Sequence, residues 1–391
     1  MLAIPKRQVV MKDAVARVLM TTDTVGGIWN FALQLATTLG DQGIQFALAT
    51  MGAPLTADQR RALVRLDNVE LFESRFKLEW MDSPWNDVQR CGGWLLELED
   101  FFRPDVVHLN SYSYGALPWR VPTLVVGHSC VFSWFAAVKG CPAPPSFWRY
   151  RNAVRAGLRG ADTVTAPTQN MLESLLHFYG PFNAVDPISN GRSFHGPSVR
   201  KKENFIITAG RLWDQAKNIA ILEKAAGAIR WPILAAGDAE NPNGGVAEFK
   251  NLHLLGQLSD MEIADRLARA SIFALPARYE PFGLCALEAA LAGCALVLGD
   301  IPSLREVWGE AAIFVCPDDE EEISDKLNRL IADPDLRIEF ASRARRRASE
   351  YLPEKMANSY FALYQSLLNR RLNSSAHTGP VTQTVAARRS S

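Results

Sequence analysis

The chain has few of the features that mark metal, redox or nucleic-acid-binding proteins. Its six cysteines, spread over 391 residues, form no CxxC pair, and its six histidines form no HxH or HExxH pattern. Neither a zinc site nor a thioredoxin-like redox pair is therefore indicated. Basic and acidic residues number 42 each, so the chain lacks the basic excess that phosphate-backbone binding requires. We expect no nucleic-acid partner.

Long hydrophobic runs are also scarce. No run reaches the ~18 apolar residues of a membrane span, because the best candidate, Val121 to Val138, is interrupted by proline, histidine and serine. The N-terminus lacks the apolar core and cleavage site of a signal peptide. We expect a cytoplasmic protein, with peripheral contact at the inner face of the membrane as an open alternative. Two segments could make that contact: the tryptophan-rich stretch and the basic run Arg343–Arg347, which otherwise reads as a solvated helix face. The stretch contains Trp80, Trp85 and Trp94.

Short apolar runs alternate with helical patterns along the chain, a rhythm typical of parallel sheets with helices on both faces. A segment rich in proline and glycine, 180–204, interrupts the rhythm once. We therefore expect two doubly wound domains with a cleft between them. The expected strands are 16–21, 44–49, 106–109, 123–126 and 163–166, then 205–209, 233–236, 252–255, 272–275, 295–298 and 313–315. The expected units are a disordered N-terminus (1–15), two domains (16–190 and 191–353), a last helix (354–372) and a disordered tail (373–391).

The most informative motif is Glu280-Pro-Phe-Gly-Leu-Cys-Ala-Leu-Glu288, which follows an expected strand and opens a helix. Pro281 suits the first helical turn, and Gly283 lets a ligand approach the backbone closely. The N–H groups of Gly283 and Leu284 would face an anion at the positive end of the helix dipole. Glu280 and Glu288 would accept hydrogen bonds from sugar hydroxyls. The alternative is an ordinary helix start with a capping and a surface glutamate.

Two cations follow the first strand of the second half. Arg211 stands at the strand end, and Lys217 begins the next helix. If they converge, they suit a pyrophosphate, which carries at least two negative charges. Two solvated surface cations are the alternative.

The first half offers a glycine pair and a histidine at strand ends. Gly26-Gly27 follows the first strand and precedes a helix, but it is not a complete GxGxxG fingerprint. It would allow close approach of a ligand, or it is a tight turn. His128 ends the strand that begins at Thr123, where it can donate or accept a proton near neutral pH. A structural role is its alternative, and it is the favoured one for His108.

Taken in order, these pieces resemble family four retaining glycosyltransferases (the glycosyl transferases group 1). The likeness covers about residues 16–370 and also includes the linker Ser189-Asn-Gly191. In the second half the matching pieces are Ala209-Gly-Arg-Leu212, Lys217-Asn218, Ala236-Gly-Asp238, Leu255-Gly256, Glu280-Pro-Phe-Gly283, Glu288-Ala289, and Gly299-Asp-Ile-Pro302 with Glu306. The resemblance implies a GT-B fold: two Rossmann-like doubly wound α/β domains that face each other across a cleft. It also implies that the last helix crosses back to the N-terminal domain.

The resemblance further implies roles for the candidate residues. Arg211 and Lys217 would hold the donor's diphosphate, Glu280 would orient its sugar, and Glu288 would contact the ribose. Gly26, Gly27, Gly283 and Leu284 would line the donor, and His128 would lie near the transferred sugar. Trp134 and Lys139 are candidate acceptor contacts. The only literal DxD, Asp333-Pro-Asp335, is favoured as a helix cap, so no metal is expected.

The expected function is the transfer of a hexose, with retention of configuration, from a UDP- or GDP-linked sugar to a lipid, glycan or small-molecule acceptor. No metal or other cofactor is expected. A nucleotide-sugar epimerase and a degenerate module that only binds a nucleotide sugar or a partner are the alternatives. The presence of all five candidate side chains, from His128 to Glu288, favours the transferase.

Overall fold

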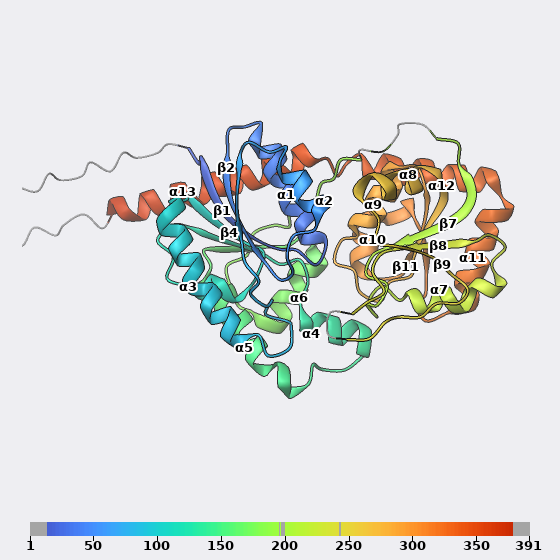
Figure 1. Ribbon diagram of the computed structural model, residues 1–391, viewed down its shortest axis with the longest axis horizontal. Helices are drawn as coiled ribbons and strands as arrows, with labels where there is room; N and C mark the ends of the chain where they lie inside the picture. Colours follow the sequence, from blue (N-terminus) through green and yellow to red (C-terminus); the bar gives the residue numbers. More distant parts are fainter. Residues whose placement is uncertain (1–13, 195, 197–199, 242–243, 378–391) are drawn as a thin grey trace, which may run out of the picture.

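Two parallel sheets, each of six strands, form the centres of two lobes that lie side by side in the computed structural model (Figure 1). The structure describes residues 14–194, 196, 200–241 and 244–377. Both sheets have the same order, with the first strand of the lobe between the second and the fourth. The expected α/β fold with two doubly wound domains is confirmed.

The first lobe has the sheet order β3-β2-β1-β4-β5-β6. Its strands are β1 Arg17–Asp23, β2 Gln45–Met51, β3 Val69–Glu73, β4 Val106–Leu109, β5 Thr123–Val126 and β6 Thr163–Thr165. Its helices are α1 Gly27–Gly40, α2 Ala57–Leu63, α3 Trp85–Phe102, α4 Val131–Trp134, α5 Trp148–Gly160 and α6 Gln169–Tyr179. The central strands are buried on both faces, which is why they read as unbroken apolar runs in the sequence.

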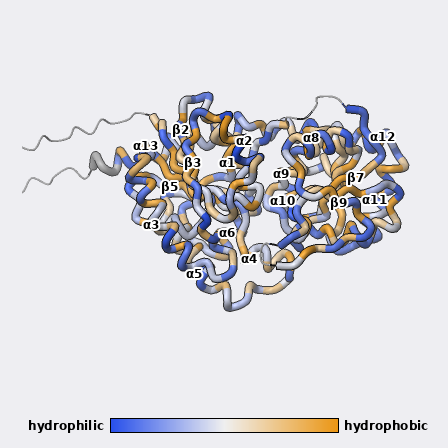
Figure 2. The backbone as a smooth tube through the Cα atoms, viewed as in Figure 1, coloured by the Kyte–Doolittle hydropathy of each residue, from blue (hydrophilic) through white to orange (hydrophobic). Residues whose placement is uncertain are grey.

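The second lobe repeats this arrangement in the order β12-β11-β10-β7-β8-β9. Its strands are β7 Glu203–Ala209, β8 Ile233–Ala236, β9 His253–Gly256, β10 Ala270–Leu275, β11 Ala295–Gly299 and β12 Ile313–Val315. Its helices are α7 Ile219–Ala225, α8 Asp260–Arg269, α9 Leu284–Leu291, α10 Pro302–Trp308, α11 Glu320–Ala332 and α12 Pro334–Ala348. Figure 2 shows the apolar residues concentrated in the strands and the hydrophilic ones on the outer helices.

The last helix, α13 (Pro353–His377), starts beside the second lobe and runs along the first (Figure 1). It packs against α1 and β4. Its residues Met356, Tyr360, Tyr364 and Leu367 belong to the hydrophobic core that also contains β1 and β2 residues. The chain therefore ties the two lobes together twice, through the linker and through α13.

Three expectations need correction. The strand β3 was not expected, because Val69-Glu-Leu-Phe-Glu73 is a short, half-exposed edge strand without a continuous apolar run. Helix α13 continues to His377, so residues 373–377 are helical rather than disordered. Ala14 and Val15, also expected to be disordered, are described in the structure, and Val15 is buried in the core of the first lobe. The remaining residues expected to be disordered, 1–13 and 378–391, lie outside the described part of the chain. Among the described residues, no helix combines the length and the hydropathy that a bilayer crossing requires.

Candidate functional site

The site lies where the carboxyl ends of β1 and β7 face each other. Each is the strand at which the order of its sheet reverses, and ligands of doubly wound sheets bind outside this point. A Cβ atom placed on Gly26 would lie 3.0 Å from Nη1 of Arg211, and one on Gly27 would lie 3.4 Å from Cδ1 of Leu284. The two glycines therefore lie where the lobes meet, and a side chain at Gly26 would press on the Arg211 guanidinium.

Arg211 is held by a carboxylate that sequence reasoning missed. Asp214 accepts hydrogen bonds from Nη2 of Arg211 at 2.7 Å and from its Nε at 3.3 Å. The Asp214 side chain is only 6% exposed, whereas that of Arg211 is 41% exposed. Burial raises the pKa of Asp214, but Arg211 outweighs it and holds the pKa below the ordinary value. Arg211 thus keeps a fixed orientation and a solvent-accessible face. Arg211 precedes Asp214 by three residues in a turn, and this spacing was the feature of the sequence that could have revealed the pair.

Lys217 forms an ion pair with Glu280, whose side chain is largely buried. The other carboxylate oxygen of Glu280 accepts the N–H groups of Gly283 at 2.9 Å and Phe282 at 3.3 Å. Burial raises the pKa of Glu280, but Lys217 and these N–H groups outweigh it, so the pKa lies below its usual range. In this structure the chain's own Glu280 occupies the Gly283 N–H, and the assignment of Gly283 and Leu284 to the donor stays a prediction. Gly283 has φ of +91°, a conformation that favours glycine.

Glu288 also has a partner that the sequence did not reveal. Nε of Arg192, within the segment that connects α6 to β7, lies 2.6 Å from the Glu288 carboxylate, and both side chains are mostly buried. The neighbouring Ser193 donates its N–H to Gln34 of α1 at 3.1 Å. The segment that joins the lobes therefore contributes a cation to the site and contacts the first lobe.

His128 is fixed by a hydrogen-bond network on the first sheet. Asn110 donates its side-chain N–H to the Thr21 carbonyl at 2.7 Å, so its amide oxygen must face the other way. That oxygen lies 2.7 Å from Nε2 of His128 and 3.2 Å from Nε2 of His108. Because an amide oxygen can only accept, both Nε2 atoms must carry protons.

The same network determines the free nitrogen of His128. Burial lowers the pKa of His128 and of His108 to about 3, so both rings are neutral. A neutral ring with a proton on Nε2 has a lone pair on Nδ1. His108 uses that lone pair to accept the Tyr364 hydroxyl of α13 at 2.6 Å. His128, which is half-buried, offers its Nδ1 as a hydrogen-bond acceptor. His108 is therefore structural, as favoured from the sequence.

The two expected acceptor contacts lie at the interface between the lobes. Nε1 of Trp134 donates to Asp214 at 3.3 Å, and Nζ of Lys139 donates to Gln215 at 2.6 Å. The Asp214 carboxylate that orients Arg211 therefore also contacts the first lobe. The segment after His128 is thus docked on the turn that contains Arg211.

A second set of contacts crosses between the lobes at α6. The Glu306 carboxylate of α10 accepts the N–H groups of Gln169 at 2.7 Å and Asn170 at 3.0 Å, which are the first residues of α6. The Thr168 hydroxyl donates to the Pro281 carbonyl at 2.9 Å. A carboxylate at a helix N-terminus is stabilising, so Glu306 helps to hold the lobes in this arrangement.

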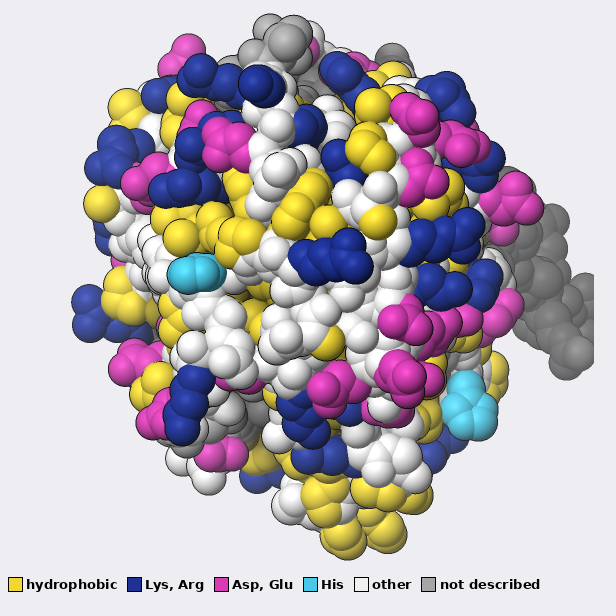
Figure 3. Space-filling view, turned by 90° about the vertical axis from the view of Figure 1, so that its right-hand side faces the viewer, with side chains coloured by type: hydrophobic (Ala, Val, Ile, Leu, Met, Phe, Trp, Pro, Cys, Tyr) yellow, Lys and Arg dark blue, Asp and Glu magenta, His cyan; other side chains and the backbone are white. Residues whose placement is uncertain are grey.

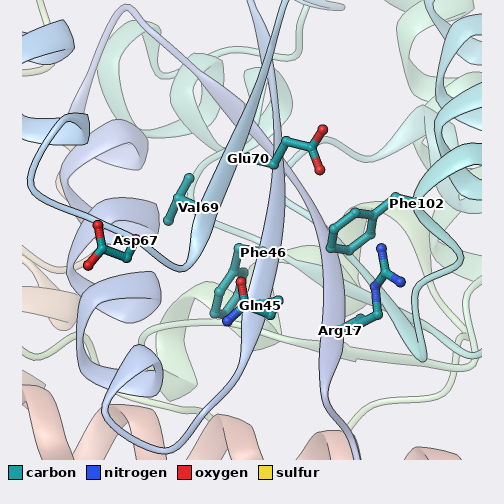
Figure 4. Close-up of a pocket in the computed structure, with 7 residues that line it drawn as sticks. All are labelled: Arg17, Gln45, Phe46, Asp67, Val69, Glu70 and Phe102. Atoms are coloured by element: carbon teal, nitrogen blue, oxygen red, sulfur yellow. The ribbon is translucent and has the colours of Figure 1, made fainter.

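The remaining pockets and motifs lie elsewhere. A pocket at the amino ends of β1, β2 and β3 is on the edge of the sheet opposite the site (Figure 4), lined by Arg17, Gln45, Phe46, Asp67, Val69, Glu70 and Phe102. In the DxD segment, Asp333 caps α12 by accepting the Leu336 N–H at 3.0 Å. Asp333, and not Asp335, is the capping residue. Within the described residues, no group of three or more potential metal ligands gathers.

Both halves of the chain match families of known proteins. Residues 192–347 match the family described as glycosyl transferases group 1, and residues 25–193 match glycosyltransferase family 4. The two matches meet in the segment that joins the lobes, and together they cover every strand of both sheets except β1, which precedes residue 25.

Curated relatives include an N,N'-diacetylbacillosaminyl-diphospho-undecaprenol α-1,3-N-acetylgalactosaminyltransferase of Campylobacter jejuni, 31% identical over 35% of this chain and 37% of that protein. An α-maltose-1-phosphate synthase of Mycolicibacterium smegmatis is 28% identical over 62% of this chain and 71% of that protein. The matched region spans about a third of the length of the first of these relatives.

Solved structures show the same fold at low identity. A sucrose-phosphate synthase of Thermosynechococcus elongatus has a TM-score of 0.74 and 18% identity, covering 92% of this chain and 100% of that chain. HepE of Anabaena, solved with UDP-glucose, has a TM-score of 0.68 and 17% identity, covering 92% and 99%. The two-domain α/β architecture is therefore GT-B, and the chain belongs to the group 1 glycosyltransferases of family 4.

Proposed function

We propose that this protein transfers a hexose from a nucleotide-diphosphate sugar, UDP- or GDP-linked, to an acceptor bound against the first lobe. One observation carries the proposal: Arg211, Lys217 and Glu280 meet at the carboxyl edge of the second sheet, opposite Gly26 and Gly27 of the first. Two cations and a buried carboxylate at the switch points of two facing sheets suit a diphosphate that carries a sugar.

The cations would act on the leaving group. As the sugar–phosphate bond breaks, negative charge develops on the diphosphate, and fixed cations stabilise it without reorganisation. Asp214 already holds Arg211 in orientation, and Lys217 would exchange part of its contact with Glu280 for a phosphate oxygen. We propose that these two side chains supply the charge that a divalent metal supplies elsewhere, so that transfer proceeds without a metal.

The carboxylates and His128 would position the donor. Glu280 would contact Lys217 and the sugar together and accept a hydrogen bond from a sugar hydroxyl. Glu288 would accept a hydrogen bond from a ribose hydroxyl. Arg192 keeps Glu288 ionised and oriented for this contact. His128 would accept a sugar hydroxyl at Nδ1, since its Nε2 proton is committed to Asn110.

Retention and the donor class are parts of the same proposal. The first lobe covers one face of the site, so departure of the diphosphate and arrival of the acceptor on the same side would retain configuration. The presence of UDP-glucose in the HepE complex and the naming of relatives as mannosyltransferases favour a UDP- or GDP-linked hexose. The relatives named for a diphospho-undecaprenol-linked sugar and for an O-antigen chain make a glycan or lipid-linked sugar the favoured acceptor.

The test is incubation of the purified protein with UDP-, GDP- and ADP-hexoses, with mono- and disaccharide acceptors and their lipid-linked forms. The expected result is release of one nucleoside diphosphate and a glycoside whose anomeric proton coupling matches that of the donor, in the presence of EDTA. An epimerised nucleotide sugar without acceptor, or binding without turnover, would overturn the proposal. Inversion of configuration would overturn only the proposal of retention, and a dependence on Mg²⁺ would overturn only the proposal of transfer without a metal.

A further inference from the structure

Acidic residues are missing from one long segment of an otherwise balanced chain. No aspartate or glutamate stands between Asp105 and Asp162, while the whole chain has 42 acidic and 42 basic residues. The basic residues of this segment are Arg120, Lys139, Arg149, Arg151, Arg155 and Arg159. The neutral total charge therefore conceals one strongly cationic region.

Helix α5 displays most of this charge on one face. Tyr150, Val154 and Leu158 are buried against the first lobe, as the helical period requires. All four arginines of the helix are exposed: Arg149, Arg151, Arg155 and Arg159. Within the described part of the chain, none of the four lies within ion-pair distance of a carboxylate. Arg149 and Arg151 instead lie over aromatic rings.

An apolar tip adjoins the amino end of this helix. Trp148, the first residue of α5, is 64% exposed. The loop before it, which protrudes at the lower end of the first lobe in Figure 1, adds the exposed side chains Cys141, Pro142, Pro144 and Pro145. The space-filling view shows apolar side chains gathered at the lowest point of the molecule, at the height of this loop (Figure 3). An exposed tryptophan and prolines next to unpaired arginines form one continuous surface.

The two segments that the sequence suggested for membrane contact make other contacts within the protein. The side chains of the three tryptophans are half-buried and pack against the first lobe's core: Trp80, Trp85 and Trp94. In α12, Arg343 pairs with Glu339 and Arg347 with Glu350, so much of the basic run is already neutralised. The four arginines of α5, by contrast, have no carboxylate within ion-pair distance among the described residues.

We propose that the tip at residues 141–148 and the arginine face of α5 dock on a bilayer rich in anionic lipids. Tryptophan is favoured at the headgroup level, where one part of the ring is apolar and the other wet. Arginines without intramolecular carboxylates are available for lipid phosphates, and an amphipathic basic helix with an apolar end matches an interfacial anchor. The occupant is therefore the membrane surface and not a neutral protein partner.

The surface begins at the edge of the candidate site. Lys139, two residues before the tip's start, already contacts Gln215 of the second lobe, and Trp134 contacts Asp214. A bilayer that meets the tip would thus lie beside these contacts between the lobes. The docking surface does not depend on the proposed transfer reaction and can be tested separately from it.

The test is co-sedimentation of the full-length protein with vesicles of phosphatidylcholine alone or with a third phosphatidylglycerol. Two variants change the surface: Arg155→Glu with Arg159→Glu, and Trp148→Ser. The matched control, Arg345→Glu with Arg346→Glu, alters net charge by the same amount on exposed positions of α12. Thermal unfolding of each variant shows that it is folded before it is compared.

We expect binding to anionic vesicles only, weakening with added salt because surface charges are screened. Each basic residue near an anionic surface contributes about a fivefold change in partitioning, so the α5 double variant should bind at least about 25-fold more weakly. The tryptophan variant should bind several-fold more weakly, and the α12 control should bind like the wild type. Equal binding to both vesicle types, no binding by the wild type, or an equal loss in the control would overturn the proposal.

Discussion

Replacing Lys217 by methionine should leave the Glu280 carboxylate buried without its counter-ion. Both side chains are mostly buried, with 17% exposure for Lys217 and 11% for Glu280. Methionine fills a similar volume, so the change removes charge more than it removes packing. The loss in the free energy of unfolding should therefore come from the buried carboxylate that remains and not from a cavity.

The size of this cost follows from what Glu280 keeps. Removal of one partner from a buried ion pair costs about 3–5 kcal/mol. Glu280 retains the N–H groups of Phe282 and Gly283 and the nearby charge of Arg211, which places the cost at the lower end. A loss of about 3 kcal/mol corresponds to a fall in Tm of about 6–12 °C for a domain of this size.

A double variant separates the unpaired charge from the lost contact. In Lys217→Met with Glu280→Gln, the amide oxygen can still accept the N–H groups of Phe282 and Gly283, and no charge is buried. This variant should recover most of the lost Tm while still failing to bind the donor. As a control, Arg305→Met removes one partner of the exposed pair with Asp300 and should cost less than about 1 kcal/mol.

The pH dependence gives a second check. In the wild type the pKa of Glu280 is depressed, so its contribution to stability is present above the unfolded pKa and is lost as the pH falls through the folded one. Burial is the largest influence on the pKa of Glu280 and raises it. In Lys217→Met the opposing charge of Lys217 is gone, so the pKa of Glu280 should rise. The penalty should then shrink as Glu280 takes up a proton between pH 7 and pH 5. Equal Tm values for wild type and single variant at pH 7, or a double variant as unstable as the single, would refute this reasoning.

Three further changes test other parts of the site. Arg192→Met should lower Tm and weaken nucleotide-sugar affinity by about tenfold. The double variant Arg192→Met with Glu288→Gln should restore Tm but not the affinity, and calorimetry measures both quantities. Asn110→Leu should let the His128 ring turn and reduce kcat about 10- to 100-fold, and ¹⁵N NMR should show the loss of a single imidazole tautomer. Glu306→Ala removes the carboxylate that accepts the Gln169 and Asn170 N–H groups at the start of α6, a contact worth up to about 1 kcal/mol. Hydrogen exchange in the first turn of α6 should therefore accelerate up to about fivefold, and unchanged exchange would contradict this inter-lobe contact.

Much of the fold could be predicted because buried parallel strands leave a clear pattern. Strands such as Val106–Leu109 and Thr123–Val126 are mainly apolar and buried at every position, since both faces are covered, and the structure has them at the expected bounds. Strand β3 lies at the edge of its sheet and is half-exposed, so its residues carry no such pattern. The extension of α13 to His377 was missed because its last turns contain mainly polar residues.

The candidate site could be predicted only as a set of separate side chains. Arg211, Lys217, Glu280 and Glu288 were identified at strand ends, but their partners were not. Arg192 reaches Glu288 across 96 positions of the sequence, a contact that no local pattern encodes. The hydrogen bond of the Gly283 N–H was missed for a different reason. A carboxylate three residues before a backbone N–H can bond to it locally, and Glu280 does so here.

The tautomer of His128 illustrates what only the network reveals. The sequence places His128 at a strand end, where a histidine can donate or accept. The Thr21 carbonyl fixes the Asn110 amide, and the amide fixes the proton on Nε2. The chemical character of this residue therefore depends on a strand that precedes it by more than a hundred positions.

The central claim is that Arg211 binds the diphosphate of a nucleotide sugar, and donor binding by calorimetry tests it most directly. Wild type, Arg211→Met and Arg343→Met are compared with UDP-, GDP- and ADP-hexoses. The control matches Arg211 closely: Arg343 is 39% exposed against 41%, and each arginine pairs with a carboxylate within four positions. One donor should bind the wild type and the control equally and stabilise both by about 2.7 kcal/mol at 100 times Kd, whereas Arg211→Met should bind at least tenfold more weakly. Equal donor affinity for Arg211→Met and the control, or no binding of any nucleotide sugar by the wild type, would contradict the account.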